Sequence, residues 1–313
     1  LSSAPFRILF EAAARVSDRR LNIFFPEGDD VRVEAAASRL VSMGWASAVL
    51  MTRRRRSDTE GSLGFKTLAR ADVLERMAPT LPTDISDEHL AAELTAAGHF
   101  DGTVIGAATH SADVISAGLA HLHRSGSSLR VAGGAWIESS ERPGRPMVFV
   151  DPSVNISPDA RTMADALTGA ASLYRAITGH DPYVGLVSWN TGREVSGSEI
   201  RSYDGLTDEL TARGLKIVSR GPAQLDALMH REVAARKGLL TEHWAPVDVV
   251  GFPSLASANI GTKIAEFVGG ASTATFTTGF DKPFNDVSRS ASVDAILAAA
   301  AMTIVQCSTR VHA

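Results

Sequence analysis

The chain of 313 residues exceeds the size at which one hydrophobic core usually stops growing, so its length favours two domains, with one large domain as the alternative. Hydrophobic residues make up 44% and charged residues 21%, which is ordinary globular usage and excludes a disordered chain. The formal net charge of -4 offers no basic surplus for a phosphate polymer. We therefore expect no nucleic-acid partner, whereas small anions stay possible.

The sequence predicts a cytoplasmic protein without a membrane segment. No apolar stretch reaches about 18 residues, and the first residues, LSSAPF, lack the basic and apolar regions of a secretory leader. Cys307 is the only cysteine, so no disulfide can form within the chain. Its place in an apolar helical run predicts a buried packing thiol in a reducing compartment, with a catalytic thiol as the alternative.

Short apolar runs alternate with longer helical patterns, which indicates parallel strands joined by crossover helices. Several runs are apolar at consecutive positions, as expected for strands covered on both faces. The segments that we read as strands are, in chain order, residues 21–25, 48–51, 103–106, 147–150, 184–188, 215–218, 247–252 and 272–277. The predicted fold class is α/β, with two Rossmann-like three-layer domains, mostly parallel sheets and a cleft between them.

Helical patterns fill the intervals between these strands, and most of them end at a glycine, the residue that favours a helix C-terminus. The helix that follows Ser157 and Pro158 has both a cap residue and a proline at its start. The predicted helices span residues 31–43, 89–97, 112–121, 159–177, 206–213, 224–237, 260–268 and 293–306.

Two irregular stretches interrupt this alternation, at residues 52–63 and 138–146. We interpret the second as the hinge, which assigns residues 1–138 and 277–313 to one domain and residues 139–276 to the other. The first contains four consecutive arginines at 53–56. Adjacent like charges repel, so this run indicates a solvated loop, with a cradle for cofactor phosphates as the alternative.

Three loops at predicted strand ends combine glycine, small hydroxyl residues and a following helix, at residues 25–30, 106–113 and 188–192. At the carboxyl edge of an α/β sheet such loops bind anions. We take Thr109, Ser111 and Thr191 from them as substrate-binding candidates. Turn residues also occur ahead of helices for purely structural reasons, so each loop alone is a weak signal of anion binding.

The most informative segment is residues 279–294, GFDKPFNDVSRSASVD, which crowds polar residues between a predicted strand and the last helix. One interpretation is a capped helix start, with Ser292 as the cap and Asp294 in the first turn. In the other, Ser288 and Arg289 present a hydroxyl, backbone amides and a guanidinium to a phosphate group.

Residues 282–289, KPFNDVSR, resemble the K-P-V-N-D-L-S-R-G motif of the phosphate acetyltransferases, or phosphotransacetylases. Other segments resemble further motifs of that family in the same order, over about residues 20–310. These segments are FPEGDD at 25–30, the A-D-V region at 106–118, DPSVNISP at 151–158, GPAQLDA at 221–227 and FPSLASANIGTK at 252–263.

The resemblance implies reversible acyl transfer between coenzyme A and inorganic phosphate, with no metal in the chemical step. It implies no tightly bound cofactor, because coenzyme A and acetyl-CoA act as substrates, and it implies a homodimer. Ser288 and Arg289 match the pair that binds phosphate in this family, so both are catalytic candidates.

Four further positions match the family motifs as substrate-binding candidates: Lys282 and Asn285 in the KPFNDVSR segment, and Asn259 and Lys263 at less well defined cleft positions. Asp226 also matches a motif, and we expect it to organise its own loop and not to react.

Two departures affect the expected chemistry. The family's general base is an aspartate seven residues after the motif serine, and that position is Ala295. Asp294 is adjacent and is our third catalytic candidate, although one step along a helix turns a side chain by about 100°. The arginine that can meet the cofactor in the A-D-V segment is Ser116. Loss of a general base lowers turnover by about 100- to 10,000-fold.

Two alternatives to an active acyltransferase stay open. A non-enzymatic module of the same fold would bind coenzyme A, an acyl phosphate or a protein partner without turnover. A nicotinamide-dependent dehydrogenase would share the alternation of strands and helices, but no G-x-G-x-x-G follows the early strands.

Overall fold

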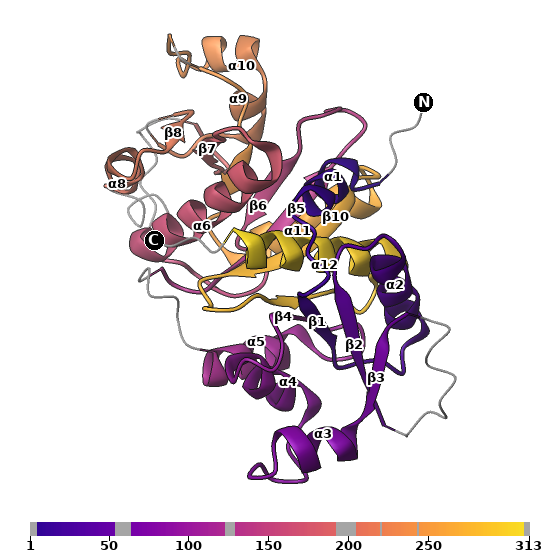
Figure 1. Cartoon of the computed structure of the whole chain (residues 1–313). Coiled ribbons are helices and arrows are strands. Elements are labelled where there is room, and N and C mark those ends of the chain that lie inside the picture. The colour runs from indigo at the N-terminus through magenta and orange to yellow at the C-terminus, as the bar shows by residue number, and fades with distance from the viewer. Residues whose placement is uncertain are drawn as a thin grey trace. The chain divides into compact units, whose positions relative to one another are not determined.

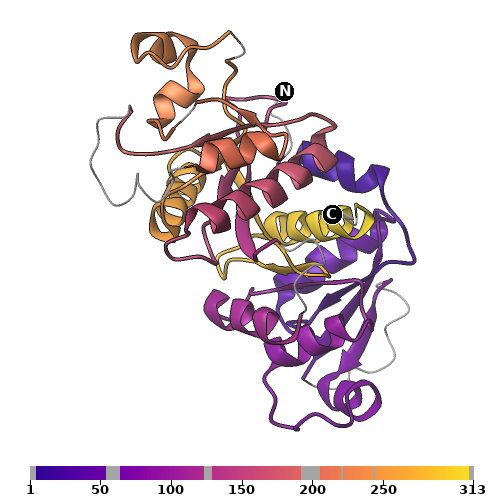
Figure 2. The same ribbon diagram turned by 90° about the vertical axis from the view of Figure 1, so that its left-hand side faces the viewer.

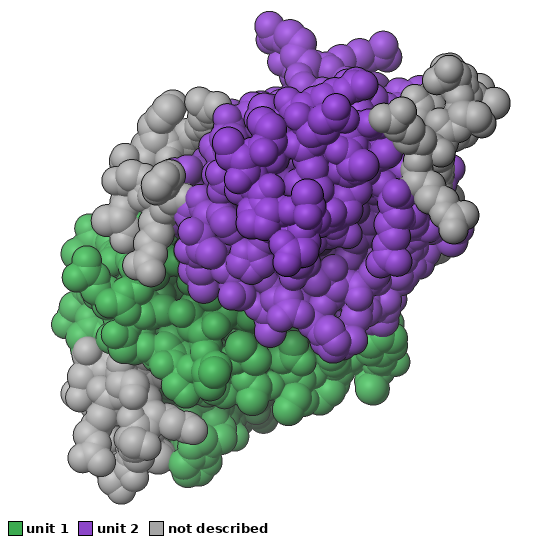
Figure 3. All heavy atoms as spheres, turned by 90° about the horizontal axis from the view of Figure 1, so that it is seen from below, with its two compact units in different colours: residues 1–3, 129–273 green, residues 4–128, 274–313 purple. Residues whose placement is uncertain are grey.

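A computed structural model describes residues 5–53, 64–122, 129–191, 205–219, 221–242 and 244–309. The chain divides into two compact units: residues 129–273 belong to unit 1, and unit 2 combines residues from 4 to 128 with residues from 274 onward (Figure 3). The predicted boundary after residue 138 lies ten residues later than the observed one after residue 128. The predicted boundary after residue 276 lies three residues later than the observed one after residue 273. That each unit is a domain in its own right stays a prediction, as does the cleft.

Unit 2 contains a five-stranded sheet in the order β11-β4-β1-β2-β3, and every pairing in it is parallel (Figure 1). Four of its strands are almost entirely buried, as consecutive apolar residues require when both faces are covered, whereas only the last residue of the edge strand β3 is buried. Their bounds are Asn22–Phe25 for β1, Ser47–Thr52 for β2, Lys66–Ala69 for β3, Gly102–Ile105 for β4 and Phe284–Asp286 for β11.

Helices cover both faces of this sheet. On one face α12 packs against α1, α2 and β4, and α2 and α12 lie side by side in Figures 1 and 2. On the other face α4 packs against α5, and Phe24 stacks on Phe100 with ring centroids 4.1 Å apart. The helix bounds are Arg7–Arg15 for α1, Val31–Ser42 for α2, Arg70–Met77 for α3, Asp87–Ala96 for α4, Ser111–His121 for α5 and Val293–Ser308 for α12.

A six-stranded sheet in the order β10-β5-β6-β9-β7-β8 has five of its strands in unit 1, whereas β10 begins in unit 1 and continues in unit 2 from residue 274. The β5–β6 pairing is antiparallel, whereas β6, β9, β7 and β8 pair in parallel. The strand bounds are Ala132–Glu138 for β5, Met147–Val150 for β6, Tyr183–Leu186 for β7, Lys216–Ile217 for β8, Val249–Gly251 for β9 and Ser272–Thr278 for β10. The helix bounds are Ala160–Thr178 for α6, Leu206–Ala212 for α8, Leu225–Met229 for α9, Arg231–Arg236 for α10 and Leu255–Phe267 for α11.

All eight predicted strands are present within a few residues, but β3, β5 and β11 were missed. The sequence of β5, AGGAWIE, contains two glycines, which weaken a strand pattern. The stretch at 138–146, which we took as the hinge, connects the antiparallel strands β5 and β6 inside unit 1. That hinge prediction is therefore wrong. Of the arginine run only Arg53 lies in the described residues.

The helix predictions need three corrections. The helix expected at 224–237 is two short helices, because the extended backbone of His230, with φ -120° and ψ 120°, separates α9 from α10. Helix α11 begins five residues earlier than expected, where Ser254 caps it with a capping box. Helices α1 and α3 were not predicted. No helix in the described residues is long and apolar enough to cross a membrane.

Asn285 joins three elements of unit 2. Its side chain is fully buried, its Oδ1 accepts a bond of 2.8 Å from the Thr277 amide, and its Nδ2 donates to Thr303 and Gln306 at 2.8 and 2.7 Å. This amide therefore links β10, β11 and α12. The expectation that Asn285 binds substrate is corrected, because every polar atom of its side chain is already satisfied inside the core.

Replacement of Asn285 by Ala should lower the free energy of unfolding by about 2–4 kcal/mol. It leaves the buried Thr277 amide and the half-buried Gln306 side-chain oxygen without the bonds that Asn285 supplies, and it removes one of the two bonds of the Thr303 hydroxyl. Urea denaturation measures this difference. Asn22→Ala is the control, since Asn22 is an exposed amide whose Nδ2 bonds only the Arg20 carbonyl at 3.2 Å. An Asn285→Ala protein of unchanged stability but weakened substrate binding would restore the original assignment.

Candidate active site

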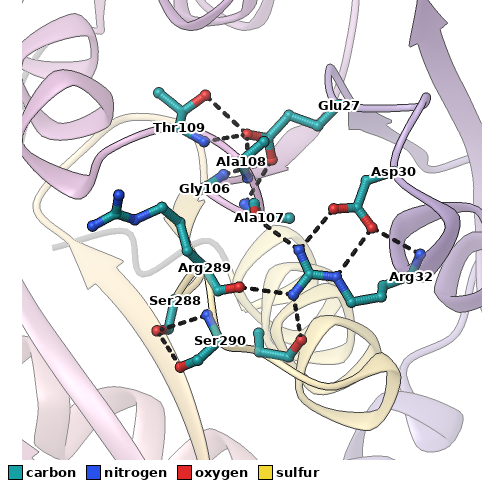
Figure 4. Close-up of polar contacts among 11 residues, drawn as sticks. Glu27, Asp30, Arg32, Gly106, Ala107, Ala108, Thr109, Ser288, Arg289 and Ser290 are labelled. Atoms are coloured by element: carbon teal, nitrogen blue, oxygen red, sulfur yellow. Dashed lines mark hydrogen bonds and ion pairs between the residues drawn. The ribbon is translucent and has the colours of Figure 1, made fainter.

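Three loops meet at the carboxyl edge of the unit 2 sheet, because β11, β4 and β1 are adjacent parallel strands. They are the loop after β1, at residues 26–30, the loop after β4, at 106–110, and the loop after β11, at 287–292. Figure 4 shows their polar contacts. In open α/β sheets, ligands bind outside the carboxyl ends of the strands.

Glu27 organises this edge. Its carboxylate accepts hydrogen bonds from the successive amides of Gly106, Ala107, Ala108 and Thr109, at 2.8, 2.7, 2.9 and 2.8 Å, and from the Thr109 hydroxyl at 2.8 Å (Figure 4). Converging amides form a concavity that binds anions, and the chain's own carboxylate fills this one. Thr109 therefore serves Glu27, which corrects its assignment as a substrate-binding residue.

Arg32 connects the three loops. Its guanidinium pairs with Asp30 at 2.7 Å and donates to the carbonyls of Ala107, Arg289 and Ala291 at 2.9, 2.8 and 2.9 Å (Figure 4). Asp30 also caps α2 by accepting from the Arg32 amide at 2.8 Å. The hydrogen bond from the Arg32 side chain is the main cause of a lowered pKa of Asp30. Arg32 thus fixes the main chain on which Ser288 and Arg289 lie.

The Ser288–Ser290 turn is exposed and polar. Ser288 Oγ lies 2.9 Å from Ser290 Oγ, and the Arg289 side chain extends from the turn with its Nη1 3.4 Å from His110 Nε2. Within the described residues, Arg289 forms no ion pair with a carboxylate. Its guanidinium is thus available to an anion beside the N-terminus of α5, where backbone amides also point outward.

Asp294 faces a different neighbour. Its carboxylate pairs with Arg39 of α2, at 2.5 Å between Arg39 Nη1 and Asp294 Oδ1. Ala295 occupies the third position of α12, and its amide donates to the cap residue Ser292 at 3.2 Å. The structure therefore does not bring the Asp294 carboxylate to the Ser288–Arg289 turn, against the expectation that it substitutes for the missing aspartate.

Asp286 is the residue that sequence reasoning missed. It ends β11, is buried, and its Oδ1 accepts no hydrogen bond in the described part of the chain. Burial is the main cause that raises the pKa of Asp286 to about 7; the nearby Glu27 charge raises it further and a hydrogen bond with Ser111 opposes the rise. The available signal was a carboxyl group in the polar segment at 279–294, two residues before Ser288.

Lys282 also has a structural contact in unit 2, because its Nζ donates to the Phe100 carbonyl at 3.0 Å. This bond holds the segment before β11 against the end of the loop after α4. Its expected role in binding substrate is not supported by this geometry. Ser116, at the position of the expected arginine, is exposed on α5. Cys307 is half-buried, not fully buried as predicted, and its thiol donates to the Asp101 carbonyl.

The three remaining candidates belong to unit 1 and make local contacts. Asn259 donates to the Pro152 carbonyl at 3.1 Å. Lys263 pairs with Glu266 at 2.9 Å and lies over the Phe267 ring. Thr191 Oγ1 accepts from the amide of Gln224, the cap residue of α9, at 3.0 Å. Their roles toward a substrate stay predictions.

A pocket of about 250 Å³ lies at the same edge of the unit 2 sheet. It is lined by both acidic and basic side chains, among them Glu27, Asp30, Arg53, Arg70 and Asp87. Arg70 pairs with Asp87 at 2.6 Å, so part of this lining is neutralised internally. The described residues contain no group of three or more ligands that could hold a metal ion.

The two sheets and the helices that pack on them define an α/β protein with mostly parallel strands. The profile of the family described as Phosphate acetyl/butaryl transferase matches residues 65–304. A phosphate acetyltransferase of Paracoccus denitrificans is 33% identical, with 94% of this chain and 96% of that protein covered. The chain therefore belongs to this acyltransferase family, and the resemblance seen in its motifs is confirmed.

Solved structures agree on the fold. A phosphotransacetylase from Streptococcus pyogenes superposes with a TM-score of 0.81 at 24% identity, covering 97% of this chain and 99% of that one. A phosphotransacetylase from Staphylococcus aureus gives a TM-score of 0.75 at 22% identity, covering 96% and 98%. The predicted α/β class with two mostly parallel sheets is confirmed.

Glu27→Gln should lower the free energy of unfolding by about 2–4 kcal/mol, because the new amide group would face N–H and O–H donors where an acceptor is required. Chemical denaturation provides the measurement. Glu75→Gln, at an exposed position of α3, makes the same chemical change without such donors. Equal stabilities for both variants would show that the loop formed by the amides of residues 106–109 does not depend on the Glu27 charge.

Proposed function

We propose that the protein is a phosphate acetyltransferase, which transfers an acetyl group reversibly between coenzyme A and inorganic phosphate. The observation that carries the proposal is the Arg289 guanidinium, which no carboxylate neutralises within the described residues, beside Ser288 and the N-terminus of α5. A planar guanidinium donates two parallel hydrogen bonds to a phosphoryl group, which lysine cannot imitate.

Phosphate chemistry is consistent with this edge of the sheet. The leaving or attacking phosphate carries negative charge, and fixed donors stabilise it without reorganisation at the moment of reaction. Arg32 contributes indirectly, because it holds the Arg289 and Ala291 carbonyls and thereby fixes the turn from which Arg289 extends. In this proposal the substrates are a coenzyme A thioester and phosphate, and the protein holds no tightly bound cofactor.

The two departures from the family motifs predict slow turnover. Ala295 supplies no carboxylate at the usual position on α12, and Ser116 supplies no cation to coenzyme A. A protein that binds coenzyme A or acyl phosphate without turnover is the second candidate function. The observation that favours it is the ion pair with Arg39, which occupies the adjacent Asp294 carboxylate.

We also propose that the protein is a cytoplasmic homodimer that associates through α11. Ile260, Ile264, Phe267 and Val268 are each more than half exposed, and their spacing places them on one face of this helix. Contiguous exposed apolar side chains mark association surfaces. In the same proposal, the two compact units are the two domains.

The activity test is release of free thiol from acetyl-CoA in the presence of phosphate. Arg289→Ala should raise the KM for phosphate by roughly 10- to 100-fold, because a hydrogen bond to a charged group contributes 1.5–3 kcal/mol. Arg289→Lys should recover only part of this loss. Arg7→Ala removes an exposed arginine of α1 and should leave KM unchanged.

An unchanged KM in Arg289→Ala would reject the phosphate site. Absence of turnover by the unmodified protein in both directions of the reaction would reject the enzyme. Calorimetric binding of coenzyme A by such an inactive protein would then favour the non-enzymatic function.

Replacement of Phe267 by Glu should convert the dimer into a monomer, because it would bury a charge in an apolar contact. Light scattering coupled to gel filtration measures the mass. Met43→Glu, at an exposed apolar residue at the end of α2, should leave the dimer intact. A Phe267→Glu protein with unchanged mass would place any interface elsewhere.

A further inference from the structure

Asp286 is a buried carboxyl group that the phosphate site does not use. Its side chain lies under the loop after β4, where a Cβ on Gly106 would collide with Asp286 Oδ1 and with the Val287 backbone. Gly106 has a φ of 112°, a conformation that side chains rarely adopt, so the loop can pass this close only with glycine. The Asp286 carboxyl and the edge loops are therefore in direct contact.

Glu27 and Asp286 are neighbouring carboxyl groups in opposite environments. Glu27 receives four amide N–H groups and one hydroxyl, which satisfy its negative charge. Asp286 is buried, has an unpartnered Oδ1 and feels the charge of Glu27, and its pKa is raised to about 7. Neighbouring carboxyl groups whose environments separate them in this way divide into a fixed charge and a proton carrier.

The other charged groups around Asp286 already form ion pairs. Asp294 of α12 pairs with Arg39, and Asp30 pairs with Arg32. The neighbours from β4 and β10 are uncharged: Ile105 pairs with Asp286 in the sheet, and the Thr275 hydroxyl donates to its main-chain oxygen. Burial is thus the main cause of the raised pKa of Asp286, and Ser111 and Glu27 are the neighbouring groups that modify it within the described residues.

Ser111 provides the route to the surface. It is the first residue of α5, it is exposed, and its side chain is near enough to the Asp286 carboxyl to lower the pKa of that group. The preceding residue, His110, places its ring 3.4 Å from the Arg289 guanidinium. A proton that leaves or reaches Asp286 through the Ser111 hydroxyl therefore does so next to the proposed phosphate site.

We propose that Ser111 and Asp286 form a proton relay that replaces the carboxylate missing at Ala295. The inference rests on the proposed function. Ser111 is the catalytic residue that meets the thiol of coenzyme A, and Asp286 is the positioning residue behind it, which stores the proton.

The step balances as follows for acetyl phosphate and coenzyme A. The thiol sulfur attacks the acetyl carbonyl carbon, a C–S bond forms, and the C–O bond to phosphate breaks with its electron pair leaving on phosphate. The thiol proton passes to Ser111 Oγ while the Ser111 proton passes to the Asp286 carboxylate. In the reverse reaction Asp286 returns the proton to the thiolate.

The first test is the pH dependence of kcat for acetyl-CoA formation. The unmodified protein should lose activity below about pH 7, where Asp286 is protonated, and reach a plateau above it. Asp286→Asn should lower kcat by about 100-fold or more, and its residual rate should climb toward the thiol pKa of about 8.5 without that plateau. The KM for phosphate should not change, because Arg289 is intact.

Three further variants complete the kinetic test. Ser111→Ala removes the hydroxyl at an exposed position and should reproduce the Asp286→Asn profile even if the buried substitution impairs folding. Ala295→Asp in the Asp286→Asn protein should recover part of kcat, because it restores the carboxylate on α12. Asp113→Asn, at an exposed carboxylate in the first turn of α5, is the matched control and should retain the full rate.

A second readout does not depend on activity. Because folding raises the pKa of Asp286 above its unfolded value, ionisation of this group costs stability as pH rises from about 4 to about 7, and the cost is constant above that. Asp286→Asn is neutral at every pH. Its Tm relative to the unmodified protein should therefore rise over this interval, whereas that of Asp113→Asn should not.

The outcomes separate the relay from the proposed function. An unmodified protein without turnover contradicts both. An active protein whose Asp286→Asn and Ser111→Ala variants keep its rate and pH profile contradicts the relay alone. Equal loss in Asp113→Asn would also overturn it. A relative Tm of Asp286→Asn that is independent of pH would show that Asp286 stores no proton.

Discussion

The candidate site depends on one arrangement, the Glu27 carboxylate inside the amides of residues 106–109. A loop of four successive N–H groups pointing inward would be unstable without an anion, and the chain supplies one from the neighbouring strand. This interaction shapes the loop after β4. It places His110 and Ser111 at the start of α5, beside Arg289.

The same charge shapes the chemistry of its surroundings. Arg32 balances Asp30 and fixes the turn after β11 through the Arg289 and Ala291 carbonyls, so that Arg289 itself stays available to an anion. Asp286 is placed where a second negative charge is unfavourable. A cation that no carboxylate neutralises within the described residues and a carboxyl group with a raised pKa thus arise from one set of loop contacts.

The contacts of α12 show what the departure from the family motif at Ala295 changes. At Ala295 the usual carboxylate is absent, and the neighbouring Asp294 stabilises the contact between α12 and α2 through Arg39. The scaffold around the turn is retained, since α12 keeps its Ser292 cap and its buried apolar residues. In our proposals, phosphate binding and proton transfer therefore depend on different residues.

The sequence alone determined the alternation of strands and helices, the family and the location of the polar segment at 279–294, because these follow from local periodicity, helix caps and short motifs. Only the tertiary structure decided what each polar side chain does. Thr109 serves Glu27, 82 residues away; Asn285 links three elements inside the core; Asp286 is buried beside a charge from another strand. A side chain's role depends on partners distant in the sequence, and no local pattern specifies those partners.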